Sequence, residues 1–374
     1  MNTQKLFPAH TTKRSLLLVG VFITIGVVTV LVSRAATVTT ISVEPENGLV
    51  SENTKLVDDP LNASNGKYIR FSSNQSKDSY ILFSSAQDSI TRQIWRMKAN
   101  GTEKIKLTDD TTSEHAWFRP SPDGTKILFM KAASGSNFNY ALESNRLWIM
   151  NSDGTNQQEI ISIAKREGYG WTGMAHADWS PDSTRIVLAA PLFFQTQLFI
   201  VDANGNNPQK VTSTTRIDGS DANVTDPTWA VTNELVYIRK WECFGFCGKH
   251  DVFKLNLTTM QETRLTNDPL WEWDPIMAPD GETISWLVTH NNSGVATRCD
   301  LVKGSAIGQL NMTSVVADGG CNANGTFSSD SGRILFLKTV GTKQSLHVVN
   351  VDGTGLVNLQ PTLAGETGIA AFWP

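Results

Sequence analysis

The longest uninterrupted apolar run lies near the start of the chain, at residues 15–33. These nineteen residues, SLLLVGVFITIGVVTVLVS, carry no charge. A helix of that length crosses the ~30 Å hydrocarbon layer of a membrane. The pattern therefore predicts one transmembrane helix over 15–33.

The charges beside this run predict its orientation. Lys5, Lys13 and Arg14 precede it, and only Arg34 follows closely. The positive-inside rule then makes 1–14 a cytoplasmic basic tail and places everything after residue 34 outside the cytoplasm. A cleaved signal peptide is the alternative, because Ser33-Arg34-Ala35 loosely matches a small-x-small cleavage site. Cleavage would make the protein secreted instead of membrane-anchored.

After this run the apolar residues alternate with polar ones in short stretches, separated by Gly, Pro, Asp and Asn turns, which predicts an all-β protein. One phrase ends a strand, turns at a Pro-Asp-Gly-type sequence and begins a new strand. It occurs as PSPDGTKILF from Pro120, WSPDSTRIVL from Trp179, MAPDGETISW from Met277 and FSSDSGRILF from Phe327, with a degenerate copy, WAVTNELVY, from Trp229. A second phrase with an Asn/Asp-Gly turn alternates with it, as in LWIMNSDG from Leu147.

The residues that precede the first turn recur at a nearly constant interval. They are separated by 59, 50, 48, 50 and 45 residues and are Pro120, Trp179, Trp229, Met277, Phe327 and Phe372. Repeats of about 40–50 residues with four strands each are typical of β-propellers. The phrases resemble the PD40 repeat, a WD40-like repeat, of the TolB-like six-bladed propellers, and this resemblance covers most of residues 78–374.

The two ends of the repeat region complement each other. Residues 79–85 match a second strand and 94–100 a third, but no first strand precedes them, whereas 369–374 match a first strand with nothing after it. We therefore expect the N- and C-terminal strands to pair and to close the propeller, which would remove its exposed edges.

Residues 34–77 form a linker between the predicted helix and the propeller. Two strand-like runs, 43–48 and 63–71, resemble the opening strands of galactose-binding carbohydrate modules. The alternative is a stalk, since too few residues match for a complete module. The sequence does not decide whether residues 41–71 bind sugar.

Charge and cysteine usage narrow the function. The net charge is −4, so nothing favours binding to nucleic acid. All four cysteines lie in the exported part, where disulfides are permitted. Sequential pairing, Cys243 with Cys247 and Cys299 with Cys321, is one of three connectivities, and four free thiols are the alternative.

The candidate ligand site lies at the mouth of the propeller channel. The residues three before each anchor are Trp117, His176, Asp226, Asp274, Asn324 and Ile369. Such polar strand starts suit the floor of a funnel, although the side chains could instead satisfy neighbouring backbone groups. Aromatic residues stand around them in the sequence, and together they would suit a sugar or a peptide. These are Tyr169, Trp171, Trp271 and Trp273.

These observations predict a binding or scaffold module for an envelope protein, peptide or glycan. The motifs of serine hydrolases, zincins and P-loop NTPases are missing from the sequence, and no catalytic residue or cofactor is predicted. One enzymatic alternative stays open: His115 or His176 could hold a divalent metal with Asp226 or Asp274. That would resemble the oligogalacturonate lyases, which are metal-dependent propellers.

Overall fold

The computed structural model divides the chain into two compact units, Met1–Ser76 and Lys77–Pro374. In the first unit it describes residues 21–24, 27–30, 54–58 and 67–71. In the second it describes 80–86, 89–98, 101–135, 142–192, 195–212, 223–230, 233–241, 249–267, 269–292, 295–306, 311–340, 343–359 and 367–372.

The described part of the first unit consists of two antiparallel pairs. Strand β1 (Val21–Thr24) pairs with β2 (Val27–Val30), and β3 (Thr54–Asp58) pairs with β4 (Lys67–Phe71). Strand β4 falls within the run predicted at 63–71, whereas the run at 43–48 lies outside the described residues.

Strands β1 and β2 differ from the helix predicted over 15–33. Val, Ile and Thr dominate these segments, and β-branched residues favour extended backbone. The rest of 15–33 lies outside the described residues. In the part of the chain that the structure describes, no helix is both long and apolar enough to cross a membrane.

The second unit is almost entirely β. Its described strands form three four-stranded sheets and one twelve-stranded sheet, which consists of three further groups of four antiparallel strands joined by the parallel pairs His250–Trp271 and Cys299–Cys321. In five of the six groups the strands follow sequence order, and in the sixth β28 precedes β5. The first strands of the groups are β8 (Ser113–Pro120), β12 (Ala175–Trp179), β16 (Asn223–Trp229), β20 (Trp271–Met277), β24 (Cys321–Phe327) and β28 (Thr367–Phe372). The second strands are β9 (Lys126–Ala133), β13 (Arg185–Leu192), β17 (Glu234–Trp241), β21 (Thr283–Asn292), β25 (Arg333–Val340) and β5 (Tyr80–Ser85).

The third and fourth strands complete each group. The third strands are β10 (Arg146–Asn151), β14 (Gln195–Asp202), β18 (Lys249–Asn256), β22 (Val295–Ser305), β26 (Lys343–Asn350) and β6 (Gln93–Lys98). The fourth are β11 (Gln158–Ile161), β15 (Gln209–Lys210), β19 (Glu262–Arg264), β23 (Thr313–Val316), β27 (Val357–Asn358) and β7 (Ile105–Lys106). One helix, α1 (Ile163–Gly168), and a 3-10 turn, η1 (Leu142–Ser144), are also present.

The repeated sequence phrase explains where strands end. Each first strand ends at the residue before the predicted turn, from Pro120 in β8 to Phe372 in β28. In the first of these turns, Ser121 Oγ donates to Asp123 Oδ1 (2.6 Å), and the same oxygen accepts from the backbone N–H of Thr125 (2.9 Å). The short Asp side chain thus replaces backbone partners within the turn.

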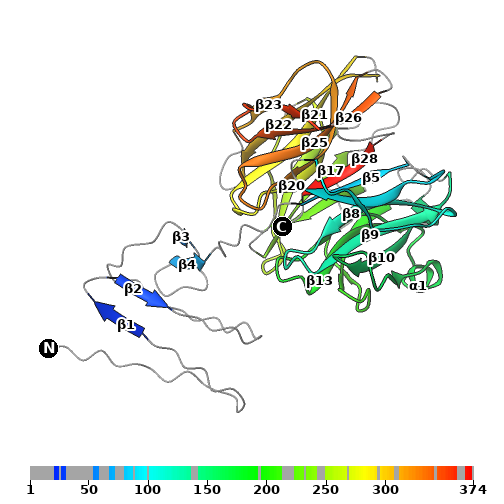
Figure 1. The fold of residues 1–374 in the computed structure, drawn as a ribbon, viewed down its shortest axis with the longest axis horizontal. Helices are drawn as coiled ribbons and strands as arrows, with labels where there is room; N and C mark the ends of the chain where they lie inside the picture. The colour runs from blue at the N-terminus through cyan, green and yellow to red at the C-terminus, as the bar shows by residue number, and fades with distance from the viewer. Residues whose placement is uncertain are drawn as a thin grey trace, which may run out of the picture. The chain divides into compact units, whose positions relative to one another are not determined.

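The two ends of this unit pair as the sequence predicted. Strand β28 lies antiparallel to β5, with Phe372 opposite Ile81, and Figure 1 shows these segments side by side in red and blue-cyan. The C-terminal strand therefore supplies the missing first strand of the group that begins at Tyr80.

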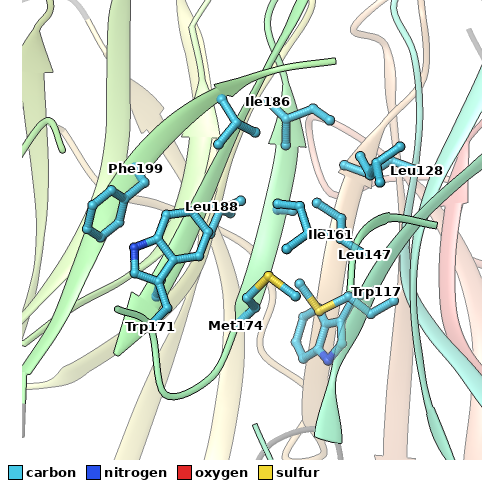
Figure 2. Packing of buried hydrophobic residues seen from close by; sticks show 14 of the residues in the cluster. Trp117, Leu128, Leu147, Ile161, Trp171, Met174, Ile186, Leu188 and Phe199 are labelled. Carbon is cyan, nitrogen blue, oxygen red and sulfur yellow. The ribbon is translucent and has the colours of Figure 1, made fainter. Parts of the chain in front are cut away.

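Six buried hydrophobic clusters lie between successive groups. Figure 2 shows one of them, in which Trp117 and Leu128 of one group pack with Ile186 and Leu188 of the next. A further cluster joins Ile81 and Phe83 to Leu335 and Leu337, so the first group in sequence packs on the last. Both faces of a sheet are buried in this way, which agrees with the continuous buried runs in second strands such as β5 and β13.

Candidate functional site

An extra residue interrupts every first strand at the same place. In β8 the register moves from Ala116 opposite Met130 to Arg119 opposite Leu128, so Trp117 and Phe118 together oppose one residue. Equivalent irregularities occur in β12, β16, β20, β24 and β28. These are β-bulges, which re-aim a side chain and end regular pairing.

Four of the predicted funnel residues occupy these bulges with left-handed backbone. Their φ angles are 51° for Trp117, 47° for His176, 52° for Asp226 and 46° for Asp274. Asp and His tolerate this region better than most residues, whereas a bulky Trp there is an outlier. The left-handed backbone therefore explains in part why polar residues occur at these positions. The strained backbone of Trp117 indicates a functional site.

The same four residues line one cavity. Trp117, His176, Asp226 and Asp274 come from β8, β12, β16 and β20, with Arg119 and Ile276 among the other lining residues. The cavity has a volume of ≈ 20 Å³, and one water molecule needs about 10–15 Å³. It has room for an ion or a water molecule, so a larger ligand would lie over its mouth.

A histidine and two carboxylates meet in this cavity. His176 Nδ1 is paired with Asp226 Oδ1, and the ligand atoms of His176, Asp226 and Asp274 all lie within 4.8 Å of one another. Burial raises the pKa of Asp226, but the charge and hydrogen bond of His176, with Lys240 and Thr225, outweigh burial and hold this pKa below its ordinary value. Asp226 is thus an anion although only 5% exposed.

Trp117 and Arg119 form the wall on the β8 side. The indole of Trp117 stacks on the His176 ring, with 4.1 Å between centroids. Because His176 covers that face, the indole offers little surface to a ligand. Arg119 donates to the carbonyl of Phe118 (3.2 Å). Burial raises the pKa of Asp178 in β12, and the charge of Arg119 opposes this rise.

Asp178 joins neighbouring groups next to the site. It accepts from its neighbour Trp179 N (2.9 Å) and, in β16, from Thr228 Oγ1 and Trp229 N (both 3.0 Å). Burial raises its pKa against these hydrogen bonds and Arg119. Asp178 is a structural clamp between β12 and β16.

Two of the predicted aromatic ligand residues lie elsewhere. Trp171 is 1% exposed and packs on Phe199 (4.7 Å between centroids), as Figure 2 shows. Tyr169 packs edge-on against Trp171, and its hydroxyl donates to the carbonyl of Gly205 (3.0 Å). Trp171 packs in the core between groups and is not among the residues that line the cavity, because helix α1 directs this segment inward.

The other two aromatic candidates surround a different histidine. His250 stacks on Trp271 (5.5 Å) and meets Trp273 edge-on (4.1 Å), while Lys240 Nζ lies 4.7 Å from the Trp273 ring centre. Burial and then the charge of Lys240 lower the pKa of His250 to about 4. Trp271 and Trp273 therefore support the wall beside Asp274 and are not among the residues that line the cavity.

His115, predicted as a metal ligand, does not join the cluster. It is fully buried, its Nδ1 contacts the carbonyl of Arg92 (3.2 Å), and its ring packs on Phe129. Burial lowers its pKa to about 4. The strand alternation, which is broken only after Ala116, directs His115 between groups, apart from the cluster of His176, Asp226 and Asp274.

The structure describes only some of the remaining candidates, which are two channel-mouth residues and the four cysteines. Asn324 lies in β24 beside the bulge, but its side chain is outside the description, as is that of Ile369. Cys299 and Cys321 form the predicted disulfide, with 4.2 Å between Cα atoms. Cys243 and Cys247 lie outside the described residues.

The sequence contained a signal for the β-bulges, namely a proline after two of the aspartates. Proline removes a ladder donor and is found inside strands mainly at bulges. Asp226-Pro227 and Asp274-Pro275 therefore mark the bulges directly, and both prolines line the cavity. Arg119 and Asp178 carried no such signal, because their positions depend on how the bulge changes strand alternation.

Comparison with known proteins adds to this geometry. No protein-family model matches the sequence, and no curated protein matches it. Among solved structures, TolB from Acinetobacter baumannii matches with a TM-score of 0.59 and 15% identity, over 79% of this chain and 67% of that one. The fold is that of a TolB-like β-propeller.

Two other solved structures also match this chain. A putative TolB from Agrobacterium tumefaciens has a TM-score of 0.54 and 12% identity, over 75% of this chain and 88% of that one. A chain of a nidogen/laminin complex has a TM-score of 0.56 and 8% identity, over 79% and 98% of the two chains. At these identities the TolB-like likeness defines the fold and leaves the function to the site.

Proposed function

We propose that this protein is a membrane-tethered, extracytoplasmic six-bladed propeller that binds a partner over the mouth of its central channel. The observation that carries the proposal is the bulge geometry. Four equivalent residues of consecutive first strands, Trp117, His176, Asp226 and Asp274, line one cavity. A repeated backbone distortion that gathers polar side chains is typical of a functional site.

The proposed ring rests on the strand pairing and the core. The groups are six among the described strands, β28 completes the group of β5, and a buried cluster joins the first group to the last. A ring closed in this way leaves no long unpaired edge.

The proposed compartment rests on the N-terminal pattern and the disulfide. The charge-free run of 15–33 follows basic residues, and Cys299–Cys321 needs an oxidising environment to persist. We expect the full-length chain to remain in the membrane fraction after alkaline carbonate extraction. Release into the soluble fraction would contradict the tether.

The site favours a protein or peptide over a glycan as partner. A sugar ring would have to lie over the mouth of the cavity, and His176 covers the indole face of Trp117 on which it would stack. A partner would therefore lie across the mouth and direct one polar group inward.

The test is chemical crosslinking and capture from envelope extract with the full-length chain, alongside a glycan array. Asp274→Asn is the site variant, and Asp352→Asn, in an exposed turn, is the matched control. A partner captured by the wild type and Asp352→Asn but lost in Asp274→Asn supports the proposal. Equal capture by all three, or a site-dependent hit on glycans alone, would contradict the peptide assignment.

A second candidate is a metal-dependent carbohydrate-active enzyme, favoured by the meeting of His176, Asp226 and Asp274. The deciding measurement is cleavage of acidic polysaccharides by the full-length chain in Mn²⁺, followed by absorbance of unsaturated products. Product formation abolished by His176→Gln would support this candidate, and no product would end it.

A further inference from the structure

We propose that His176, Asp226 and Asp274 bind one divalent transition-metal ion, which links three neighbouring blades at the channel mouth. The proposal does not depend on the partner, and metal binding can be measured with no partner present. It can therefore fail while the proposed binding function stands.

The spacing of the ligand atoms suits one ion. The imidazole nitrogen and the two carboxylate oxygens lie within 4.8 Å of one another. An ion about 2.0–2.6 Å from each ligand requires such atoms to be at most roughly 4–5 Å apart. The cavity that they line accommodates an ion, and its remaining coordination positions would face the channel mouth.

The charges also favour a cation. The carboxylates of Asp226 and Asp274 approach each other, and Asp226 is only 5% exposed. Its Oδ2 accepts a long hydrogen bond (3.4 Å) from the backbone N–H of Asp274. Its Oδ1 is paired with His176 Nδ1 and accepts from Thr225 Oγ1 (2.9 Å). By comparison, both oxygens of Asp178 in β12 accept bonds of 2.9–3.0 Å. Asp226 Oδ2 thus keeps acceptor capacity that an ion would use.

The ligand types indicate which ion. One imidazole with two carboxylates suits Mn²⁺, Fe²⁺ or Zn²⁺, whereas Ca²⁺ and Mg²⁺ prefer oxygen ligands alone. Two positive groups lie nearby: Arg119 lines the cavity, and the charge of Lys240 contributes to the lowered pKa of Asp226. These charges limit the affinity of the site for a cation.

The placement of the ligands is rigid. Each of the three residues sits on a bulge with φ between 46° and 52°, in strands β12, β16 and β20. Strands position ligands better than loops do, because their backbones are fixed on both sides. An ion held here would connect three blades, because its ligands come from three different first strands.

The experiment uses the full-length chain, purified without chelators for metal analysis, then stripped and titrated calorimetrically with MnCl₂, ZnCl₂ or CaCl₂. We expect about one Mn²⁺ or Zn²⁺ per chain. Asp274→Asn should weaken binding at least about 100-fold, since even indirect partners of metal ligands contribute 10–100-fold. His290→Gln is the matched control, because His290 also pairs with an aspartate, Asp300 (2.9 Å), but beside Arg298.

The outcomes are distinct. Binding that survives in His290→Gln within about 3-fold and fails in Asp274→Asn supports the site. No binding by the wild type, equal loss in both variants, or tighter binding of Ca²⁺ than of Mn²⁺ and Zn²⁺ would overturn it. A nitrogen coupling in the pulsed EPR spectrum of the Mn²⁺ form, lost in His176→Gln, checks the imidazole ligand without relying on Asp274.

Discussion

Two aspartates on neighbouring first strands show how the same residue type serves different purposes. Asp178 in β12 accepts three hydrogen bonds, two of them from β16, and burial raises its pKa. Asp226 in β16 lines the cavity, pairs with His176 and has a lowered pKa. Both carboxylates accept three bonds, but the bond to Asp226 Oδ2, from the backbone N–H of Asp274, is long (3.4 Å). Asp226 Oδ2 therefore keeps acceptor capacity toward the cavity.

The difference follows from the bulge. Asp226 occupies the left-handed position that re-aims its side chain, whereas Asp178 lies two residues after the equivalent His176 and faces the next strand. The position relative to the bulge therefore distinguishes Asp178, which joins two strands, from Asp226, which faces the cavity. Substitution of each residue tests this distinction.

The largest expected effect is on stability, from Asp178→Asn. An amide keeps one acceptor oxygen, so at least one buried donor among Thr228 and the backbone of Trp179 and Trp229 loses its partner. We expect the free energy of unfolding to fall by about 3 kcal/mol, and by about 1 kcal/mol for Asp226→Asn. Urea unfolding in metal-free buffer measures both, and equal losses would contradict the distinction.

Metal should reverse the ranking of the two variants. At a metal concentration of 100 Kd, the wild type should gain about 2.7 kcal/mol of stability. Asp178→Asn should gain about as much, and Asp226→Asn almost nothing. Thermal unfolding with and without MnCl₂ or ZnCl₂ measures the gain, and a full gain in Asp226→Asn would be inconsistent with its role as a ligand.

Acid sensitivity between pH 7 and pH 5 should come from buried histidines and not from Asp226. The pKa of His115 and of His250 is lowered to about 4. The unfolded chain binds protons near pH 6.5 while the native chain does not, so stability is complete above pH 6.5 and falls toward pH 4. At pH 5 we expect a loss of about 2 kcal/mol per histidine.

Variants assign this loss to its source. His115→Gln should flatten the dependence of unfolding free energy on pH by one histidine's share. Asp226→Asn should leave the slope between pH 7 and pH 5 unchanged, because the lowered pKa of Asp226 moves its contribution to pH below 3.8. A flattened slope in Asp226→Asn would instead assign the acid sensitivity to the cavity.

The smallest predicted effect concerns Arg119. Its charge lines the cavity and opposes a metal ion, so Arg119→Gln should tighten binding of Mn²⁺ about 3- to 10-fold. Calorimetric titration at low salt measures the change. Weaker binding in this variant would mean that Arg119 positions the ligands instead of competing with the ion.

Much of the propeller could be predicted because its turns carry chemistry in the sequence. The Ser-x-Asp turn fixes where Pro120 and Trp179 end their strands, and counting back three residues from each such anchor located Trp117, His176, Asp226 and Asp274. These positions could be located because the same turn recurs in several copies, whereas one copy alone would not have shown which position is equivalent in each strand.

The rest depended on contacts that spacing does not encode. Trp171 looks like a surface aromatic in an irregular segment, but helix α1 returns it to the core. His115 and Trp117 differ by two residues and yet lie in different environments, because the bulge between them breaks the alternation. The run at 15–33 satisfied the length of a membrane helix while its β-branched residues also suited strands β1 and β2.

The most direct test of the metal centre is anomalous diffraction from crystals of the full-length chain grown with Mn²⁺ or Zn²⁺. We expect one strong anomalous peak between His176, Asp226 and Asp274, with both carboxylates and the imidazole Nδ1 within bonding distance of the metal. A peak confined to other residues, or density showing the His176–Asp226 pair unchanged in saturating metal, would contradict it.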